Sequence, residues 1–247
     1  MMKNKFFYDL VYSRGQTLVA LMISVALSSF LLLVIMQFYS QHQQQNREML
    51  LRLQLQTELQ RVIQLIGKDL ARSGFRAVSD KLTKNNLALF ELGNIPSSVF
   101  ITQMNSERNN SCVLFFYDLD SNGCIGTGYQ EGACISNKRN ATKEIERELF
   151  GYRLHQKMLE TRLTYKSAVK QNCNREECQR YTQQSACNHG GWVDLLDDKV
   201  YEISHLSFDW LSEKQGVEIR LAGHFKTNKK IKYETTLVVP LLNGDKQ

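Results

Sequence analysis

Residues 17–36 contain no charged side chain, and this run constrains the fold of the chain more than any other feature. In a helix that rises about 1.5 Å per residue, the run is about 30 Å long, which matches the hydrocarbon core of a bilayer. A cleaved secretory signal has a shorter apolar region of about 7–15 residues, followed by small residues at its cleavage site. The apolar run instead continues to Phe38 and Tyr39. We therefore expect a retained membrane helix within residues 16–40.

The charges before this run predict its orientation. Lys3, Lys5 and Arg14 precede the apolar residues. Basic residues next to a membrane helix favour the cytoplasmic side. We expect residues 1–15 to be cytoplasmic and the bulk of the chain to face the periplasm.

The residues after the apolar run have the pattern of an amphipathic helix. No Pro or Gly occurs between residue 41 and Gly67, and Ser73-Gly74 provides a helix stop. Apolar residues recur there at steps of three or four, at Leu51, Leu55, Leu59, Val62, Ile66 and Leu70. We predict one continuous helix from residue 17 to about residue 73. Residues 41–74 form its outer half and use the apolar stripe to hold a globular head over residues 75–247.

The head has the pattern of an antiparallel sheet. Short apolar or alternating runs occur at residues 112–117, 150–154, 159–165, 200–211, 217–225 and 231–241. The last two are separated by residues 227–230, which read as a hairpin turn. Successive strands with short connections indicate an α+β fold in which the sheet packs on the stripe of the helix.

All six cysteines lie in the head, at Cys112, Cys124, Cys134, Cys173, Cys178 and Cys187. An even number in an exported chain favours disulfides. A zinc site is the alternative, but it favours a C-x2-C pair, and the closest spacing is Cys173-x4-Cys178. Five of the six lie in the polar insertions 121–147 and 167–191, which disulfides can hold without a larger core. Six cysteines allow about fifteen pairings, and the spacing leaves the choice open.

One segment matches half of a calcium loop. Asp118, Asp120 and Asn122 alternate before Gly123, as in D-x-D-x-N-G, and their oxygens suit a hard cation. The twelfth position, where such a loop has a bidentate Glu, is Tyr129, and Glu131 follows two residues later. The alternative is an ordinary polar turn after a strand. Calcium is therefore a prediction for which half of the ligand set is missing.

Catalytic motifs are absent from the sequence. The five histidines show no metalloprotease spacing, and no nucleophile elbow, P-loop or dinucleotide fingerprint occurs. We expect no enzymatic activity and no cofactor. The chain has 31 basic and 25 acidic residues, a formal charge of +6. This excess is scattered, so nucleic-acid binding is left open.

The junction before the apolar run resembles the signal of type IV prepilins. In that family a basic leader ends in glycine, and a membrane peptidase cuts before the apolar segment and methylates the new amino terminus. Gly15, Thr17 and Leu18 fit this pattern, whereas Gln16 replaces the usual phenylalanine and Ala20 the usual glutamate. The resemblance implies a leader over residues 1–15, cleavage between Gly15 and Gln16, and N-methylation of Gln16.

Later motifs resemble the PilW / PulJ-like minor pilins, and within them the prepilin peptidase-dependent protein B type. These motifs are the helix end at residues 68–75 (KDLARSGF), the strand at 112–118 (CVLFFYD), the strand at 150–154 (FGYRL), and Cys187 with Gly191-Trp192. The resemblance covers most of the chain and implies a type IV pilin-like fold.

The resemblance also suggests a disulfide pattern. Cysteines before the first strand motif and before the Gly-Trp loop recur in the resembling branch, which implies a Cys112–Cys187 bond. Cys124–Cys134 and Cys173–Cys178 would then close local loops. A cross-link between the two insertions is the alternative.

The resemblance implies a structural subunit that helps to initiate or cap a type IV pilus or a related fibre for DNA uptake, adhesion or secretion. Its expected partners are major and minor pilins, the prepilin peptidase and the assembly platform of the inner membrane. The expected location is the inner membrane and then the fibre. The alternative is a signal-anchored periplasmic binding domain that does not polymerise.

Overall fold

The computed structural model describes residues 17–78, 84–92, 97–128, 132–164 and 170–243. The chain divides into two compact units, Met1–Leu50 and Leu51–Gln247.

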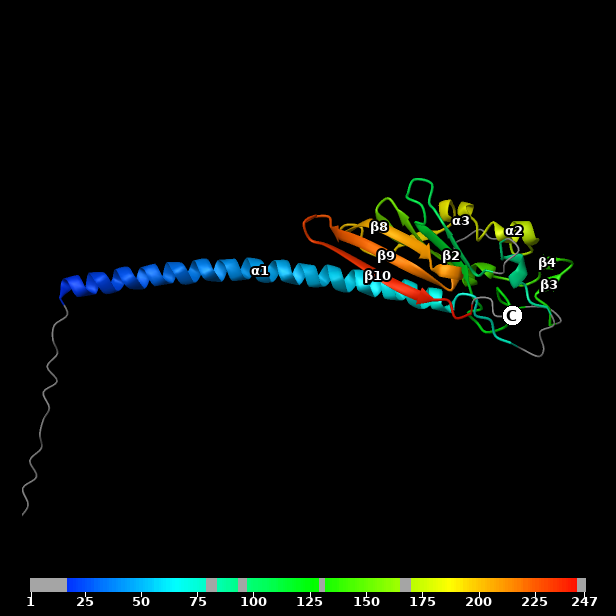
Figure 1. Cartoon of the computed structure of the whole chain (residues 1–247), viewed down its shortest axis with the longest axis horizontal. Coiled ribbons are helices and arrows are strands. Elements are labelled where there is room, and N and C mark those ends of the chain that lie inside the picture. Colours follow the sequence, from blue (N-terminus) through cyan, green and yellow to red (C-terminus); the bar gives the residue numbers. More distant parts are fainter. Residues whose placement is uncertain (1–16, 79–83, 93–96, 129–131, 165–169, 244–247) are drawn as a thin grey trace, which may run out of the picture. The chain divides into compact units, whose positions relative to one another are not determined.

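Within the first unit, the described residues belong to the long helix α1 (Leu18–Arg72) (Figure 1). Every side chain from residue 17 to residue 50 is exposed. The sequence contains no Pro or Gly between residue 18 and Gly67, so nothing interrupts the helical hydrogen bonds. The single helix predicted from residue 17 to about residue 73 is confirmed.

Within the second unit, the outer part of α1 buries one stripe against the head. The buried residues are Leu55, Leu59, Val62, Ile63, Ile66, Gly67 and Leu70. The predicted stripe is therefore correct from Leu55 onward, while Leu51 is only partly buried. The helix ends before Gly74, whose φ of 73° is the left-handed conformation that commonly terminates helices.

The head contains two main antiparallel sheets where the sequence suggested one. The first has the order β1-β2-β5-β6-β7 and comprises β1 (Val99–Thr102), β2 (Cys112–Phe116), β5 (Leu149–His155), β6 (Met158–Arg162) and β7 (Trp192–Asp194). The second has the order β10-β9-β8 and comprises β8 (Tyr201–Trp210), β9 (Gly216–Phe225) and β10 (Lys232–Pro240). The backbone N–H of Phe208 in β8 donates to the carbonyl of Asn110, a loop residue of the first sheet, so a loop joins the sheets at this point.

Small residues allow α1 and the second sheet to approach closely. A Cβ atom on Gly67 would overlap the Leu237 side chain of β10, and one on Gly223 of β9 would lie 3.4 Å from Leu59 of the helix. Figure 1 shows β10, in red, lying beside the end of α1. The amphipathic part of α1 therefore packs directly against β9 and β10.

All five residues of strand β2 are buried, which shows that this strand lies in the interior of the head. Val113 and Phe115 belong to the core that includes α1 and the second sheet. Cys112, Leu114 and Phe116 belong to a second core that includes the cysteines of the later insertion. The continuous apolar sequence of β2 therefore reflects burial on both faces of the sheet.

The two insertions contain short elements that the sequence did not predict. They are the 3-10 helix η2 (Ile145–Glu148), the hairpin strands β3 (Ile135–Ser136) and β4 (Arg139–Asn140), and the helices α2 (Arg175–Gln179) and α3 (Gln184–Asn188). Helix α2 begins with a capping box between Asn174 and Glu177. The earlier 3-10 helix η1 (Leu87–Leu89) and the later η3 (Ser212–Lys214) lie outside the insertions.

Candidate functional site

The first candidate surface is the apolar part of α1, from Leu18 to Tyr39. Its side chains are widely exposed; Leu33, for example, is 68% exposed. A soluble domain rarely exposes an apolar surface of this extent, which marks a membrane or protein contact. Among the described residues, α1 is the helix that is long and apolar enough to cross a membrane. It is therefore a candidate membrane anchor.

The few polar side chains of this surface are satisfied within the helix. The hydroxyls of Ser24, Ser28 and Ser29 donate to the carbonyls of Leu21, Ser24 and Ala26, at 2.8, 2.7 and 2.9 Å. A hydroxyl without a partner is costly in an apolar environment, and these bonds remove that cost. The serines are therefore compatible with lipid or with a packed bundle of helices.

The expected processing site lies just before this surface. Gly15 and Gln16 are outside the described residues, so their predicted roles in cleavage and N-methylation stay predictions. Ala20 lies in the first turn of α1, where its backbone N–H contacts the Thr17 hydroxyl at 3.4 Å. It offers no carboxylate to a neighbouring subunit.

The second candidate site is the disulfide-bonded end of the head. The structure joins Cys112 to Cys187, Cys124 to Cys134, and Cys173 to Cys178. These are the pairs suggested by the family resemblance, and all six residues have no exposed surface. The first bond links β2 to α3, and the other two close loops within the insertions. Cys187 is consequently not available as a nucleophile, although His189 follows it closely.

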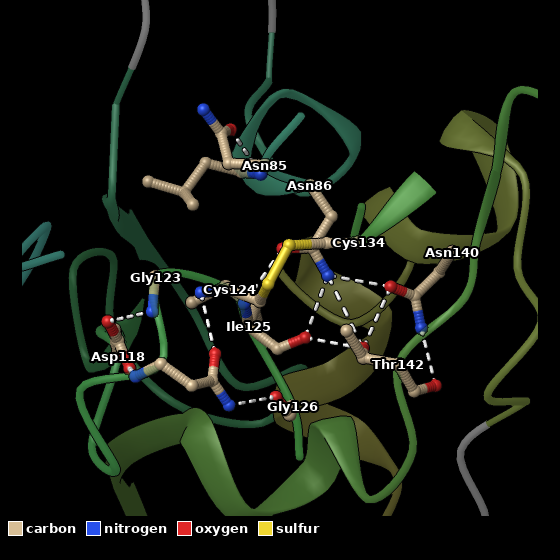
Figure 2. Close-up of a disulfide and its surroundings, with 12 residues drawn as sticks. Asn85, Asn86, Asp118, Gly123, Cys124, Ile125, Gly126, Cys134, Asn140 and Thr142 are labelled. Carbon is tan, nitrogen blue, oxygen red and sulfur yellow. Dashed lines mark hydrogen bonds between the residues drawn. A yellow bond between two sulfur atoms is a disulfide. The ribbon is translucent and has the colours of Figure 1, made fainter. Parts of the chain in front are cut away.

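A buried amide lies beside the Cys124–Cys134 bond (Figure 2). Asn86 has no exposed surface, and its side-chain oxygen accepts the backbone N–H of Ile125 at 2.7 Å. Its side-chain nitrogen donates to the carbonyl of Ile125 at 2.7 Å and to Asn140 Oδ1 at 2.6 Å. The Thr142 hydroxyl lies 2.6 Å from the same Ile125 carbonyl and 2.9 Å from Asn140 Oδ1, and it can donate its one hydrogen to either oxygen. Asn86 thus fixes two insertion segments to the region before β1.

The proposed calcium loop is held by its own backbone. Asp118 is 1% exposed and accepts the N–H groups of Ala77, Asn122 and Gly123, at 2.9, 3.0 and 2.8 Å. The side-chain oxygen of Asn122 accepts the Cys124 N–H, while its nitrogen donates to Asp120 and to the Gly126 carbonyl. Figure 2 shows the bond between Gly123 and Asp118. These contacts are those of a polar turn.

A third carboxylate joins this loop from η2. Glu148 is 1% exposed and accepts the N–H groups of Leu119, Asp120 and Gly126, at 2.7, 3.2 and 2.6 Å. Burial raises the pKa of Glu148 to about 7, because the charged form loses its hydration, while the three N–H groups act in the opposite direction. The nearby charge of Asp120 adds to the rise.

The three acids Asp118, Asp120 and Glu148 each place an oxygen within 4.8 Å of the others. Glu148 therefore supplies the acid that the sequence pattern lacked. Calcium usually takes about 6–8 oxygen ligands, whereas the Asn122 oxygen is used by a backbone N–H. Tyr129 and Glu131 lie outside the described residues. Calcium binding by Asp118, Asp120 and Asn122 stays a prediction.

Sequence reasoning missed Glu148 and Asn86, which organise the disulfide-bonded end. Each lies more than twenty residues from its partners, since Asn86 is 39 positions from Ile125 and Glu148 is 29 from Leu119. No local motif encodes such distances. The nearest signal was the calcium-like half-loop, which showed that ligands were missing but did not point to Glu148.

Comparison with known proteins adds a family to this geometry. A family model described as "Prepilin peptidase-dependent protein B" matches residues 48–241. The chain belongs to the prepilin peptidase-dependent protein B family. It is also 55% identical over 234 residues to an uncharacterized protein of Haemophilus influenzae (strain ATCC 51907 / DSM 11121 / KW20 / Rd), which covers 94% of this chain and 98% of that protein. No solved structure matches the chain.

The match to the prepilin peptidase-dependent protein B family contains the outer part of α1 and nearly the whole head. It therefore contains the three disulfides, Asn86 and Glu148. The family name implies dependence on a prepilin peptidase and a link to pilus machinery. The apolar residues before residue 48 are outside the match, so their interpretation as an anchor depends on length, composition and exposure.

Proposed function

We propose that this protein is a minor pilin, a structural subunit that helps to initiate or cap a type IV pilus or a related fibre. The observation that carries the proposal is the exposed, uncharged segment of α1, whose helix continues into a disulfide-bonded head. An anchored protein needs a helix that spans the membrane, and a polymerising pilin reuses that helix as a packing surface. Membership of the prepilin peptidase-dependent protein B family supports this use.

In this proposal the leader is cytoplasmic and the head is periplasmic before assembly. The positive charges of Lys3, Lys5 and Arg14 support this orientation. The disulfides support the same side of the membrane, since they persist in oxidising compartments. The subunit then moves from the inner membrane into the fibre. DNA uptake, adhesion and secretion are all compatible uses.

The proposed partners are the prepilin peptidase, other pilins and the assembly platform. The motifs at residues 68–75, 112–118 and 150–154 support a PilW / PulJ-like minor pilin. The proposal assigns no enzymatic reaction to the chain. Its Cys187 is in a disulfide, and the carboxylates of the 118–126 loop and Glu148 bind backbone N–H groups.

The test is the amino terminus of the mature protein. We expect mass spectrometry to find a chain that begins with N-methylated Gln16. Gly15→Leu should retain the leader, because a side chain before the cut would crowd the peptidase, while Ser13→Leu should be processed normally. An intact Met1 in the wild type, or normal processing of Gly15→Leu, would contradict the proposal and favour a signal-anchored binding domain.

A further inference from the structure

A groove of about 480 Å³ lies along β1. Strand β1 itself forms one side. The lining also includes Leu92, Gln183, which precedes α3, Trp210 and Lys214. The volume is in the range of about 300–1,000 Å³ that is typical of ligand sites. The groove is therefore large enough for a short polypeptide segment.

The edge of β1 in this groove has backbone groups available for pairing. Strand β1 is the first strand of its sheet and pairs only with β2 among the described strands. The Phe116 N–H donates to the Ser98 carbonyl. The backbone N–H and C=O groups of Ser98, Phe100 and Thr102 therefore point toward β2. The backbone groups of the alternate residues Val99 and Ile101 point away from β2. The Ser97 hydroxyl donates to the Val99 carbonyl and accepts the Val99 N–H, so both outward backbone groups of Val99 have a partner. No hydrogen bond to the outward groups of Ile101 occurs among the described residues.

The walls of the groove suit a strand added at this edge. Side chains of a strand alternate between the two faces of its sheet. In β1, Ile101 packs with the core that includes Trp210, whereas Phe100 belongs to the core that includes Leu92. An added strand would likewise direct alternate side chains toward Trp210 and toward Leu92. The groove therefore has surfaces for both faces of an incoming strand.

The charge of the groove lining indicates one further property of a segment that would bind there. Lys214 is the charged residue of the lining, and its Nζ lies 5.7 Å from the centroid of the Trp210 ring. No ion pair of Lys214 is found in the described part of the chain. A carboxylate on the occupant would compensate this charge. A single lysine offers little to a nucleic acid, whose backbone needs several cations.

We propose that the groove binds an extended segment of a partner protein, which pairs with the edge of β1 opposite β2 and places an acidic side chain beside Lys214. Backbone hydrogen bonds to Ile101 give this strand pairing its affinity. The surfaces near Trp210 and Leu92, which meet alternate side chains of the bound segment, give it selectivity. The proposal concerns the head and does not depend on leader cleavage or polymerisation. Failure of the amino-terminal test therefore leaves it standing, and its own failure leaves the pilin proposal standing.

The experiment uses the full chain in detergent micelles and two fluorescein-labelled peptides of seven residues. Both alternate threonine and valine, and the central residue is glutamate in one and lysine in the other. We expect fluorescence anisotropy to show about tenfold tighter binding of the glutamate peptide, and N-methylation of its central backbone nitrogens should weaken binding by about tenfold. Lys214→Glu should reverse the preference between the peptides, whereas Lys230→Glu at a distant hairpin should retain it.

Hydrogen exchange locates the contact. The glutamate peptide should slow exchange of the Ile101 amide and leave the amides of β10 unchanged. The proposal is overturned if neither peptide binds, if both bind equally, or if the Lys214→Glu protein keeps the wild-type preference. Binding without protection of Ile101 also contradicts it, because the peptide then occupies another surface.

Discussion

At the scale of single residues, Glu148 makes the head sensitive to pH. Its pKa in the fold is about 7, above the ordinary value of 4.5, so folding favours the protonated form. The corresponding stabilisation is complete below about pH 4.5 and is lost as the pH rises through 7. We expect the free energy of unfolding to fall by about 1–3 kcal/mol over this range because of this group.

Denaturant titrations from pH 5 to pH 8, followed by the fluorescence of Trp192 and Trp210, check this expectation. Glu148→Gln cannot ionise, and its stability should vary less with pH than that of the wild type. The exposed Glu213→Gln is the control and should retain the wild-type slope. Identical slopes for the wild type and Glu148→Gln would contradict the assignment.

Asn86 gives a second prediction at this scale. Asn86→Ala leaves the buried N–H of Ile125 without its partner. It also removes the bonds to the Ile125 carbonyl and to Asn140 Oδ1, two oxygens that the Thr142 hydroxyl can also reach. We expect a loss of about 2–4 kcal/mol in unfolding free energy. Asn85→Ala is a matched control, because Asn85 accepts one N–H, from Leu87, and should cost about 0.5–1 kcal/mol. Equal losses from urea denaturation of the two variants would show that the network is not a stabilising centre.

At the scale of elements, the contact between α1 and β10 depends on a missing side chain. Gly67→Ala improves helix propensity by about 0.5–1 kcal/mol, but its Cβ meets the Leu237 side chain. We therefore expect Gly67→Ala to destabilise the wild type and to stabilise a Leu237→Ala protein. A double-mutant cycle by denaturant titration measures this reversal. If Gly67→Ala has the same effect in both backgrounds, the packing explanation is wrong.

The disulfides differ in the length of chain that they close. Cys112–Cys187 spans 75 residues, whereas Cys173–Cys178 spans 5. Loop-closure entropy predicts a loss of about 4–5 kcal/mol when the first is removed and about 2 kcal/mol when the second is removed. Paired Cys→Ser variants, compared by denaturant titration, test this order.

In the wild type, a thiol reagent added without reductant should label none of the six cysteines; labelling of all six would exclude the disulfides.

The elements differ in how much the sequence could reveal. The spacing of Leu55, Leu59 and Val62 predicts a buried helix face, and alternation predicts β8 and β9, because these signals are local. Strand β1 (VFIT) is only four residues long, and its pairing with β2 depends on a chain reversal that no turn motif announces. The acidic loop was visible as Asp118 and Asp120, but its completion by Glu148 was not. Contacts between polar residues that are far apart in the sequence form only in the complete fold, so a local sequence pattern does not predict them.

At the scale of the whole molecule, and given the proposed pilin function, Ala20 suggests a position in the fibre. In the pilins that this chain resembles, a glutamate at this place meets the amino terminus of a neighbour, because an unpaired charge in hydrocarbon is costly. A subunit at the tip has no earlier neighbour and can lack this carboxylate. We expect few copies of this protein in sheared fibres, with crosslinks near one end. Quantitative mass spectrometry that finds it along the shaft, at an abundance comparable to the major pilin, would exclude a tip position.

The Cys112–Cys187 bond also sets how far a loaded subunit can lengthen. An unfolded segment extends by about 3.3–3.6 Å per residue, so the 75 positions enclosed by this bond correspond to about 250 Å of chain. With the bond intact, tension applied between α1 and β10 bypasses that segment through the sulfur atoms. A pulled subunit would then release only the segments outside the bond, and its extension would be about 250 Å shorter than that of the reduced protein. The covalent cross-link therefore limits how far the chain can extend, and it keeps residues 112–187 in one closed loop even after the strands outside it have been drawn out.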